Sequence, residues 1–266
     1  ITVVRCVPTS DARGNAPLVE AMDAATDMSV IDAYLLMKSS CRLDMYGEAI
    51  LKDYMKIAEI EKDMAAVIAK AETLSEYPLF TKPANLGSSV GVTKCNNRSD
   101  LQEGLMEAAS FDRRILVQKG IKDVREIEVS VLGNDDPVAS VPGEILPSRE
   151  FYSYESKYID GTSGYEIPAR LPHETTQMIR EYAVRAYKAI DCAGMARVDF
   201  FVEKDTNKVY LNELNTIPGF TEISMYPKLW EASGLSYGRL VDRLIELAME
   251  RKTDRDQTSH TFRSRA

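Results

Sequence analysis

The chain has 266 residues, of which 44% are hydrophobic and 28% charged, so we expect a soluble globular protein with room for two modest domains. Its formal net charge of −8 argues against a nucleic-acid binder driven by bulk charge, whereas nucleotide binding needs only a local basic pocket. No apolar run approaches the roughly 20 residues of a membrane span, and Ile1–Val4 does not resemble a signal peptide. We therefore expect a cytoplasmic protein without membrane partners.

The cysteines and histidines exclude several kinds of site. The four cysteines are scattered without a CxxC pair, which favours free thiols in a reducing cytosol over a zinc site. Of the two histidines, His173 follows a proline at the start of an expected helix and His260 lies in a polar tail. We interpret both as structural or surface residues, so chemistry built on a histidine general base, including a Ser-His-Asp triad, is nearly excluded.

Thr2–Val7 could be a strand and Ala16–Ala25 a helix, and from Ala49 the pattern predicts a helix, a strand and a second helix. Apolar residues recur at helical spacing from Ala49 to Ala71, which indicates the first helix. Tyr77–Pro83 is typical of a strand that ends at its proline. Ser99 is expected to cap the second helix, with Gln102 three residues later as its capping-box partner.

Three strands and a long loop come next. The predicted strands are Arg114–Gln118, Glu126–Leu132 and Pro137–Ile145, and the second alternates strictly between apolar and polar side chains. Leu146–Tyr165 is a polar segment rich in Ser, Tyr and Gly. A loop of this length in a compact domain is usually functional or disordered.

Two amphipathic helices are predicted in the last third of the chain. They are Glu174–Ile190 and Tyr237–Met249, each with apolar residues at helical spacing. After the second helix, Arg251–Ala266 is charged and polar, and we expect it to be frayed.

A hairpin between these helices carries the most informative polar residues. Arg197 and Asp199 alternate on one strand, Glu213 and Asn215 alternate on the next, and the polar segment Glu203–Lys208 between them favours a turn. The hairpin would gather three oxygen ligands beside one guanidinium. Such a group suits Mg²⁺ that carries nucleotide phosphates, although a salt-bridged sheet face is the plainer alternative.

Other polar segments are weaker evidence taken singly. Asn85–Gly91 has the glycines and hydroxyls of a phosphate-binding loop but not the GxxxxGK[ST] order, and a plain turn explains it equally well. Lys82 beside it would supply a positive charge or be solvated. Lys157 and Tyr158 in the long loop would form a lid over a site or be solvated. The turn at Thr216–Gly219 would present the Gly219 N–H to a developing anion.

Six segments together resemble the D-alanine–D-alanine ligases of the ATP-grasp superfamily. They are YPLFTKPANLGSSVGVTKCNN, REIEVSVLGND, PGEILPSREFYSYESKY, ARVDFF, LNELNTIPGFTEISMYP and GLSYGRLVDRLIELA, and they run in family order from about Tyr77 to Glu250, roughly two-thirds of the chain. The resemblance implies an α+β (α/β) ATP-grasp fold, in which two subdomains with antiparallel sheets clasp ATP. The expected parts are a remnant of an amino-terminal domain (1–45), a small subdomain (46–126), a carboxy-terminal subdomain with the metal site and lid (127–250) and a polar tail (251–266).

The resemblance also implies a role for individual residues. ATP would contact Lys82 through its phosphates, Glu126 through its ribose, Lys157 in the closing loop, and an adenine slot lined by Gln118, Lys119 and Ile121. Two Mg²⁺ ions, replaceable by Mn²⁺, would be held by Asp199, Glu213 and Asn215. Catalytic roles would fall to Ser88, Lys157, Tyr158, Arg197 and Gly219, and the second substrate would bind Ser224 and Met225.

The implied activity is ATP-dependent ligation of two D-alanines through an acyl phosphate, for peptidoglycan synthesis, by a homodimer. Gln118 departs from the family, which usually has an acid there, and Lys38 is only a weak match to the family's second ATP lysine. The family's GGxSxEH segment, whose glutamate binds the first D-alanine, is absent, and its HGxxGEDG segment is not recognisable. The alternatives are a Mg-ATP-binding fragment or degenerate homologue without ligase activity, and a D-Ala-D-Ser or D-Ala-D-Lac ligase. Tyr158 favours D-alanine over D-lactate, because the depsipeptide-forming relatives lack that tyrosine.

Overall fold

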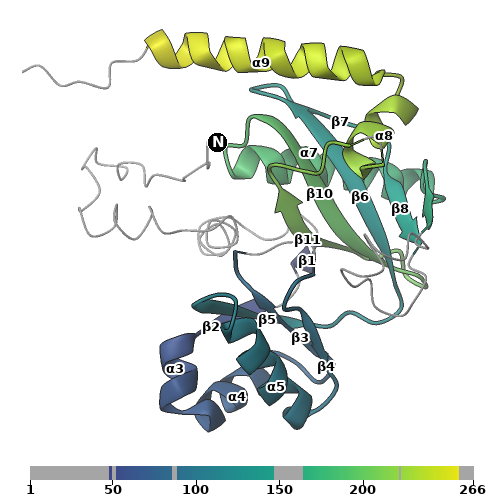
Figure 1. Cartoon of the computed structure of the whole chain (residues 1–266). Helices are drawn as coiled ribbons and strands as arrows, with labels where there is room; N and C mark the ends of the chain where they lie inside the picture. Colours follow the sequence, from purple (N-terminus) through teal and green to yellow (C-terminus); the bar gives the residue numbers. More distant parts are fainter. Residues whose placement is uncertain (1–47, 50–51, 86–88, 147–163, 222, 258–266) are drawn as a thin grey trace, which may run out of the picture. The chain divides into compact units, whose positions relative to one another are not determined.

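A computed structural model gives the fold of most of the chain (Figure 1). The residues it describes are 48–49, 52–85, 89–146, 164–221 and 223–257. Their contacts divide the chain into two compact units. Unit 1 comprises the chain up to Glu126 with Ile145–Glu166 and Phe200–Asn212, and unit 2 comprises Ile127–Glu144, Ile167–Asp199 and Glu213–Ala266. The subdomain boundaries expected from the sequence stay predictions.

Unit 1 contains an antiparallel four-stranded sheet with helices on one face (Figure 1). The strand order is β2-β5-β3-β4, with bounds Lys52–Lys56, Arg114–Lys119, Leu79–Pro83 and Thr93–Cys95. The helices are α3 (Ile57–Lys62), α4 (Met64–Glu72) and α5 (Arg98–Ala109). One face of the sheet therefore meets a helical layer.

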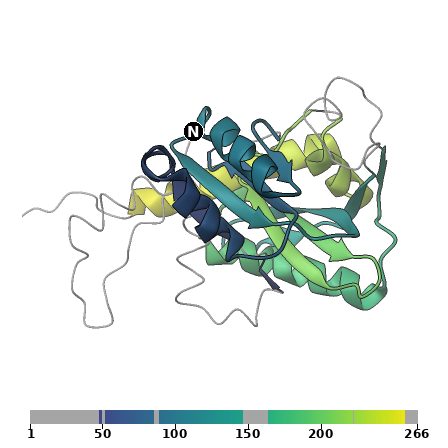
Figure 2. The ribbon, with the colours of Figure 1, turned by 90° about the horizontal axis from the view of Figure 1, so that it is seen from below.

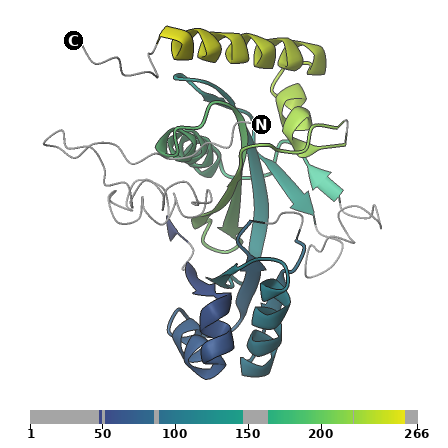
Figure 3. The ribbon, with the colours of Figure 1, turned by 60° about the vertical axis from the view of Figure 1, so that its left-hand side comes forward.

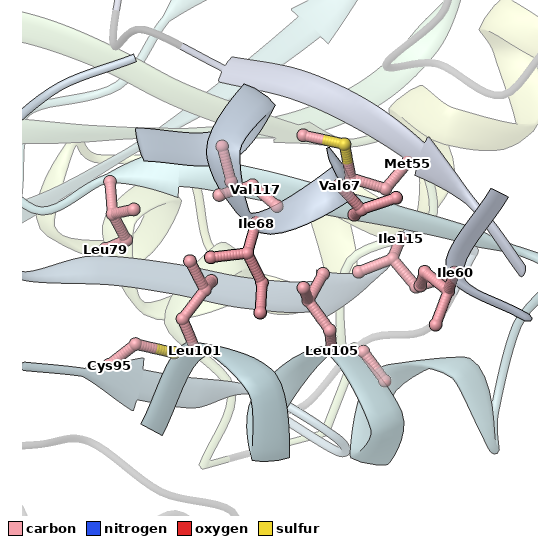
Figure 4. Packing of buried hydrophobic residues seen from close by; sticks show 12 residues of the cluster. Met55, Ile60, Val67, Ile68, Leu79, Cys95, Leu101, Leu105, Ile115 and Val117 are labelled. Atoms are coloured by element: carbon pink, nitrogen blue, oxygen red, sulfur yellow. The ribbon is translucent and has the colours of Figure 1, made fainter. Parts of the chain in front are cut away.

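The core of unit 1 fills the space between that sheet face and the helices (Figure 4). Alternate residues of β3 and β5 point into it, because side chains change face at each step along a strand. Its fully buried members include Met55, Leu79, Cys95, Leu101, Leu105, Ile115 and Val117. A continuous apolar layer of this kind is the main source of stability for the sheet and its helices.

Two sequence predictions in unit 1 are wrong in detail. The helix expected over Ala49–Ala71 starts only at Ile57, because Lys52–Lys56 pairs with β5 and buries Met55 as a strand residue. The pairing overrides the helical spacing. The cap of α5 is Asn97, whose side chain accepts hydrogen bonds from the backbone of Ser99 (2.9 Å) and Asp100 (3.0 Å).

The second sheet has seven strands in the order β1-β11-β10-β6-β8-β9, with β7 paired to β6. Glu48–Ala49 (β1) runs parallel to β11, whereas β7 is antiparallel to β6. The remaining bounds are β6 Val124–Gly133, β7 Val138–Ala139, β8 Gly143–Leu146, β9 Gly164–Glu166, β10 Gly194–Glu203 and β11 Val209–Asn215.

In unit 2 the middle of this sheet is covered on both faces (Figures 2 and 3). Helix α7 (His173–Ala189) runs alongside β10, and its Tyr187 hydroxyl donates to the Gly133 carbonyl over 2.7 Å. Helix α8 (Met225–Ala232) lies on the other face, where the Ser130 hydroxyl donates to the Tyr226 carbonyl over 3.1 Å. Helix α9 (Tyr237–Gln257) completes the second core, which contains Leu132, Tyr226, Trp230, Leu240 and Leu247.

Three predictions in the second half of the chain need correction. The strand expected over Pro137–Ile145 is two short strands, because Pro142 has no N–H to donate to a ladder. The last helix continues to Gln257, so the first part of the expected frayed tail is helical. Its exposed charges form pairs such as Lys252–Asp256 that support a helix without apolar periodicity. Among the described helices, none combines the length and apolarity needed to cross a membrane.

Candidate functional site

The hairpin predicted between Gly194 and Asn215 is present. Along β10 every second side chain from Ala196 to Val202 is buried, so Arg197 and Asp199 share the other face. The turn closes with hydrogen bonds between Glu203 N and Lys208 O and between Asn207 N and Glu203 O, each 3.0 Å. In this hairpin Asn215 of β11 lies beside Asp199, on the polar face of β10.

Arg197 and Asp199 form a two-point ion pair on that face. The guanidinium donates from Nε to Asp199 Oδ1 and from Nη2 to Asp199 Oδ2, each over 2.7 Å. Asn215 Nδ2 donates to Asp199 Oδ2 over 3.0 Å. The Arg197 side chain is 22% exposed and the Asp199 side chain 13%. Short, paired bonds between partly buried charges fix both side chains.

A second carboxylate joins the cluster from the neighbouring strand β6. Glu128 Oε2 lies 3.2 Å from Arg197 Nε, outside hydrogen-bond geometry, so the contact is an ion pair. Burial lowers the pKa of Arg197, but the carboxylates of Asp199, Glu128 and Glu213 outweigh it and raise the pKa above its ordinary value. Arg197 is therefore surrounded by carboxylates from three strands, β6, β10 and β11.

These residues fit a hard divalent cation. Carboxylate and amide oxygens are the ligands that Mg²⁺ prefers. Asn215 uses its nitrogen for Asp199, and within the described residues its Oδ1 makes no hydrogen bond. No group of three or more His, Cys, Asp and Glu placed to hold a metal occurs in the described part of the chain.

In unit 1 the predicted nucleotide residues Lys82 and Gln118 share one sheet face. Phe80 pairs with Gln118 and Lys82 pairs with Leu116 across β3 and β5, and directly paired residues point the same way. This face is opposite the one that packs on the helices, which takes Leu79. The register therefore brings a cation and an amide to the same surface of the sheet.

Gln118 is buried but incompletely bonded. Its side chain is 5% exposed, and Nε2 makes a long contact of 3.5 Å with Asn212 Oδ1. Oε1 is buried and has no donor within the described residues. A buried carbonyl oxygen without a donor is rare, and it suits a ligand that carries an amino group, such as adenine.

The chain after Gln118 is held close to the residues before β3. Gly120 N donates to Pro78 O over 2.9 Å, and a Cβ added to Gly120 would lie only 2.7 Å from the same oxygen. Only glycine fits there. Strand alternation turns the Lys119 side chain to the face opposite Gln118, so any contact of Lys119 with a ligand on the Gln118 face would involve its backbone.

Gly219, Ser224 and Met225 lie close together at the start of α8. A Cβ on Gly219 would approach Ser224 Oγ to 3.0 Å, and this hydroxyl also contacts Thr221 N (3.0 Å) and Thr221 Oγ1 (2.9 Å). The Met225 side chain is buried beside Gly143 and turned away from solvent. A ligand at this end of α8 would meet backbone and hydroxyl groups.

The remaining predicted residues are only partly placed. Ile121 and Glu126 are half-buried, at the approach to β6 and near its start. Ser88, Lys157 and Tyr158, like Lys38, lie outside the described residues.

Sequence reasoning missed Glu128 and Asn212 as members of these clusters. On the sequence Glu128 was one of several alternating polar residues of a strand, which normally face water. The structure buries it to 9% exposure. Two features of the sequence point to Glu128. It is two residues after Glu126 on one strand, and Arg197 and Asp199 have the same spacing on another.

Comparison with known proteins supports the resemblance. Residues 50–246 match a family model described as "D-ala D-ala ligase C-terminus". A D-alanine–D-alanine ligase from Acetivibrio thermocellus is 56% identical over 76% of this chain and 53% of its own length. The chain thus spans about half the length of that curated relative.

Solved structures show the same fold. The D-alanine–D-alanine ligase of Coxiella burnetii matches with a TM-score of 0.72 and 34% identity, over 89% of this chain and 61% of that one. A D-Ala:D-Ser ligase from Enterococcus faecalis matches with a TM-score of 0.69 and 32% identity, over 85% and 63%.

The two sheets with their polar faces are therefore those of an ATP-grasp protein of mixed α and β structure, as predicted. Within that class, the chain belongs to the D-alanine–D-alanine ligase family, and it matches that family's carboxy-terminal part.

Proposed function

We propose that this protein joins two D-alanines to D-alanyl-D-alanine with hydrolysis of ATP to ADP and phosphate, for peptidoglycan synthesis in the cytoplasm. The observation that carries the proposal is the row of Arg197, Asp199 and Asn215, with Glu213 beside it, in a chain of this family. A guanidinium beside an acidic pair suits a reaction that handles phosphate anions with a divalent cation.

The proposed reaction has two steps. The carboxylate of the first D-alanine attacks the γ-phosphorus of ATP, which gives an acyl phosphate and ADP. The amine of the second D-alanine attacks the acyl carbon, and phosphate leaves. The second step passes through a tetrahedral oxyanion, and we assign its stabilisation to Arg197 and the Gly219 N–H.

Bound Mg²⁺ or Mn²⁺ would offset the negative charge of the phosphates. Asp199, Glu213 and Asn215 would hold two such ions, and Lys82 would add positive charge at the phosphates. Gln118 Oε1 would accept the adenine amino group, with Lys119 and Ile121 alongside it and Glu126 at the ribose. Ser224 and Met225 would bind the carboxylate of the second D-alanine, and Ser88, Lys157 and Tyr158 would complete the site from the loops. We also propose a homodimer.

The proposal is tested by ADP release. Purified protein with Mg-ATP should release ADP when D-alanine is added and very little without it, and D-lactate or D-serine as second substrate should support less turnover. No turnover with D-alanine, or higher turnover with D-serine, would contradict the assignment. Light scattering on the same sample tests the homodimer.

Calorimetry separates ligation from nucleotide binding alone. Tight binding of Mg-ATP with no phosphate release in the presence of D-alanine would identify a nucleotide-binding module without ligase activity. Weak binding of Mg-ATP would contradict both functions, because the Lys82–Gln118 face and the Asp199 cluster would then have no nucleotide.

A further inference from the structure

Two carboxylates lie close to one nitrogen of Arg197. Its Nε donates to Asp199 Oδ1 over 2.7 Å, and Glu128 Oε2 lies 3.2 Å from the same nitrogen without hydrogen-bond geometry. The Glu128 side chain is 12% exposed, so its charge is little screened by water. The guanidinium is therefore pulled from two sides by charges on different strands.

The carboxylates of Asp199 and Glu128 differ in the other groups that they bind. Asp199 already accepts from Arg197 at both oxygens and from Asn215 Nδ2, and under the proposed function it is also a metal ligand. A cation on Asp199 would draw on the same lone pairs that hold Arg197. Glu128 stands on β6, outside the predicted metal ligands, and its attraction for Arg197 does not depend on a metal.

We propose that Glu128 is a positioning residue for Arg197, which keeps the guanidinium in place when Asp199 engages a cation. Within the described residues Nη1 of Arg197 makes no hydrogen bond. The edge of the guanidinium that carries Nη1 can therefore donate to an anionic ligand. An anchor at Nε fixes the direction of that edge. The inference rests on the proposed function for the presence of the cation and of the reacting anion.

The fold supplies the rigidity such an anchor needs. Two residues after Glu128 on the same face of β6, Ser130 is fully buried and donates to the Tyr226 carbonyl over 3.1 Å. The Tyr226 hydroxyl donates to Val131 O over 3.0 Å. Helix α8 thus holds β6 at two points next to the carboxylate, so Glu128 is mounted on a fixed strand.

The test follows the Arg197 Nε–H signal by nitrogen–proton NMR, assigned by its loss in Arg197→Lys. In wild-type protein the Nε–H should exchange slowly with water both without ligand and with Mg²⁺ and a non-hydrolysable ATP analogue. In Glu128→Gln we expect slow exchange without ligand, because Asp199 still accepts, and about tenfold faster exchange with the metal–nucleotide, because a neutral acceptor holds the guanidinium more weakly. Slow exchange in Glu128→Gln under both conditions would overturn the inference.

Glu144→Gln is the matched control. Glu144 is a buried glutamate on the adjacent strand β8, 8% exposed, but its neighbour Gly143 faces α8, so Glu144 points to the opposite face from Glu128. We expect no change of Nε–H exchange in this variant. Faster exchange there as well would mean that any lost buried charge loosens Arg197, and the assignment to Glu128 would fail.

Kinetics add a second readout. Glu128→Gln should lower kcat by about tenfold with little change in KM for ATP, because the Arg197 contact is made to the developing anion. Unchanged kcat in an otherwise active enzyme would refute the role of Glu128 and leave the ligase assignment intact. An inactive wild-type protein would instead refute the proposed function, and the NMR result would still decide the anchoring.

Discussion

The Arg197 cluster and the Gln118 side chain are both shielded from solvent, but they differ in how well their polar groups are paired. Arg197 has two carboxylates within 3.2 Å, and the Asp199 that it binds also accepts from Asn215. Gln118 is more deeply buried, at 5% exposure, yet among the described residues it has one side-chain contact, of 3.5 Å, and no donor to its carbonyl oxygen. A charge cannot be buried alone, whereas an unpaired amide costs about 1–3 kcal/mol and can be carried until a ligand arrives. Within the described residues the charges of the first cluster are therefore paired with one another, whereas the second has an acceptor that we propose a ligand fills.

The largest effect should come from removing the charge that holds the first cluster. Arg197→Met would leave Asp199 and Glu128 buried without their cation, and we expect a loss of about 3–5 kcal/mol in the free energy of unfolding. Urea unfolding without metal measures it. Arg243→Met is the control, because Arg243 is 41% exposed and pairs only with surface carboxylates. Equal losses of unfolding free energy in the two variants would show that the buried cluster stabilises the fold no more than a surface ion pair does.

A substitution in the hydrophobic core measures how much a buried apolar side chain contributes to the free energy of unfolding. Leu105→Ala removes a fully buried side chain from the unit 1 core (Figure 4) and should cost about 2–5 kcal/mol. Met106→Ala, at a neighbouring position that is 59% exposed, should change stability little. Thermal unfolding of both variants tests the assignment of the inner face of α5.

Gln118→Met should separate stability from binding. The apolar replacement removes a carbonyl oxygen that has no donor in the described part of the chain, so the unfolding free energy should stay within about 1 kcal/mol of wild type or rise. Binding of Mg-ATP should weaken by about tenfold, because the acceptor for the adenine amino group is gone. Calorimetry measures the affinity, and Gln102→Met on the exposed side of α5 is the control. A destabilised variant with normal affinity would reverse our interpretation of Gln118.

The last prediction concerns two buried thiols and needs no substitution. Burial raises the pKa of Cys95 to about 11 and that of Cys192 to about 11, from an ordinary value of 9.0. Alkylation at pH 8, followed peptide by peptide, should be about a hundredfold slower at both cysteines in folded than in unfolded protein. Because these thiols ionise near pH 9 only in the unfolded chain, the stability they contribute is complete below pH 9 and is lost as the pH rises towards 11. Stability that increased across this range would contradict the burial.

The sequence predicted the hairpin because its information is local. Alternation along two consecutive strands joined by a turn placed Arg197, Asp199 and Asn215 on one face without knowledge of the rest of the fold. Glu128 was not predicted as a partner, because a polar residue in an alternating strand normally faces water. Its burial follows from the packing of α8 against β6, seen in the hydrogen bond between Ser130 and Tyr226, which are 96 residues apart.

Other misses have the same origin. Lys52–Lys56 has helical spacing but pairs with β5, and that pairing is set by residues more than 50 positions away. Helix α8 was not predicted, because it has eight residues and contains Pro227 in its first turn. The adenine-slot interpretation of Gln118 came from resemblance alone, since nothing local shows that a strand glutamine is buried with a free acceptor.

The double attachment of Tyr226 to β6 also matters for engineering. Its carbonyl and its hydroxyl are both hydrogen-bonded to the strand that carries Glu128. Ser224, two residues earlier, lies next to Gly219. Under the proposed function, a graft that exchanges the segment around Ser224 to change which amino acid is accepted second would also alter the proposed support of Arg197, unless Tyr226 is retained. If the proposed function holds, selectivity for the second amino acid and reaction rate would be coupled, and libraries should vary the residues before Tyr226 with this side chain held constant.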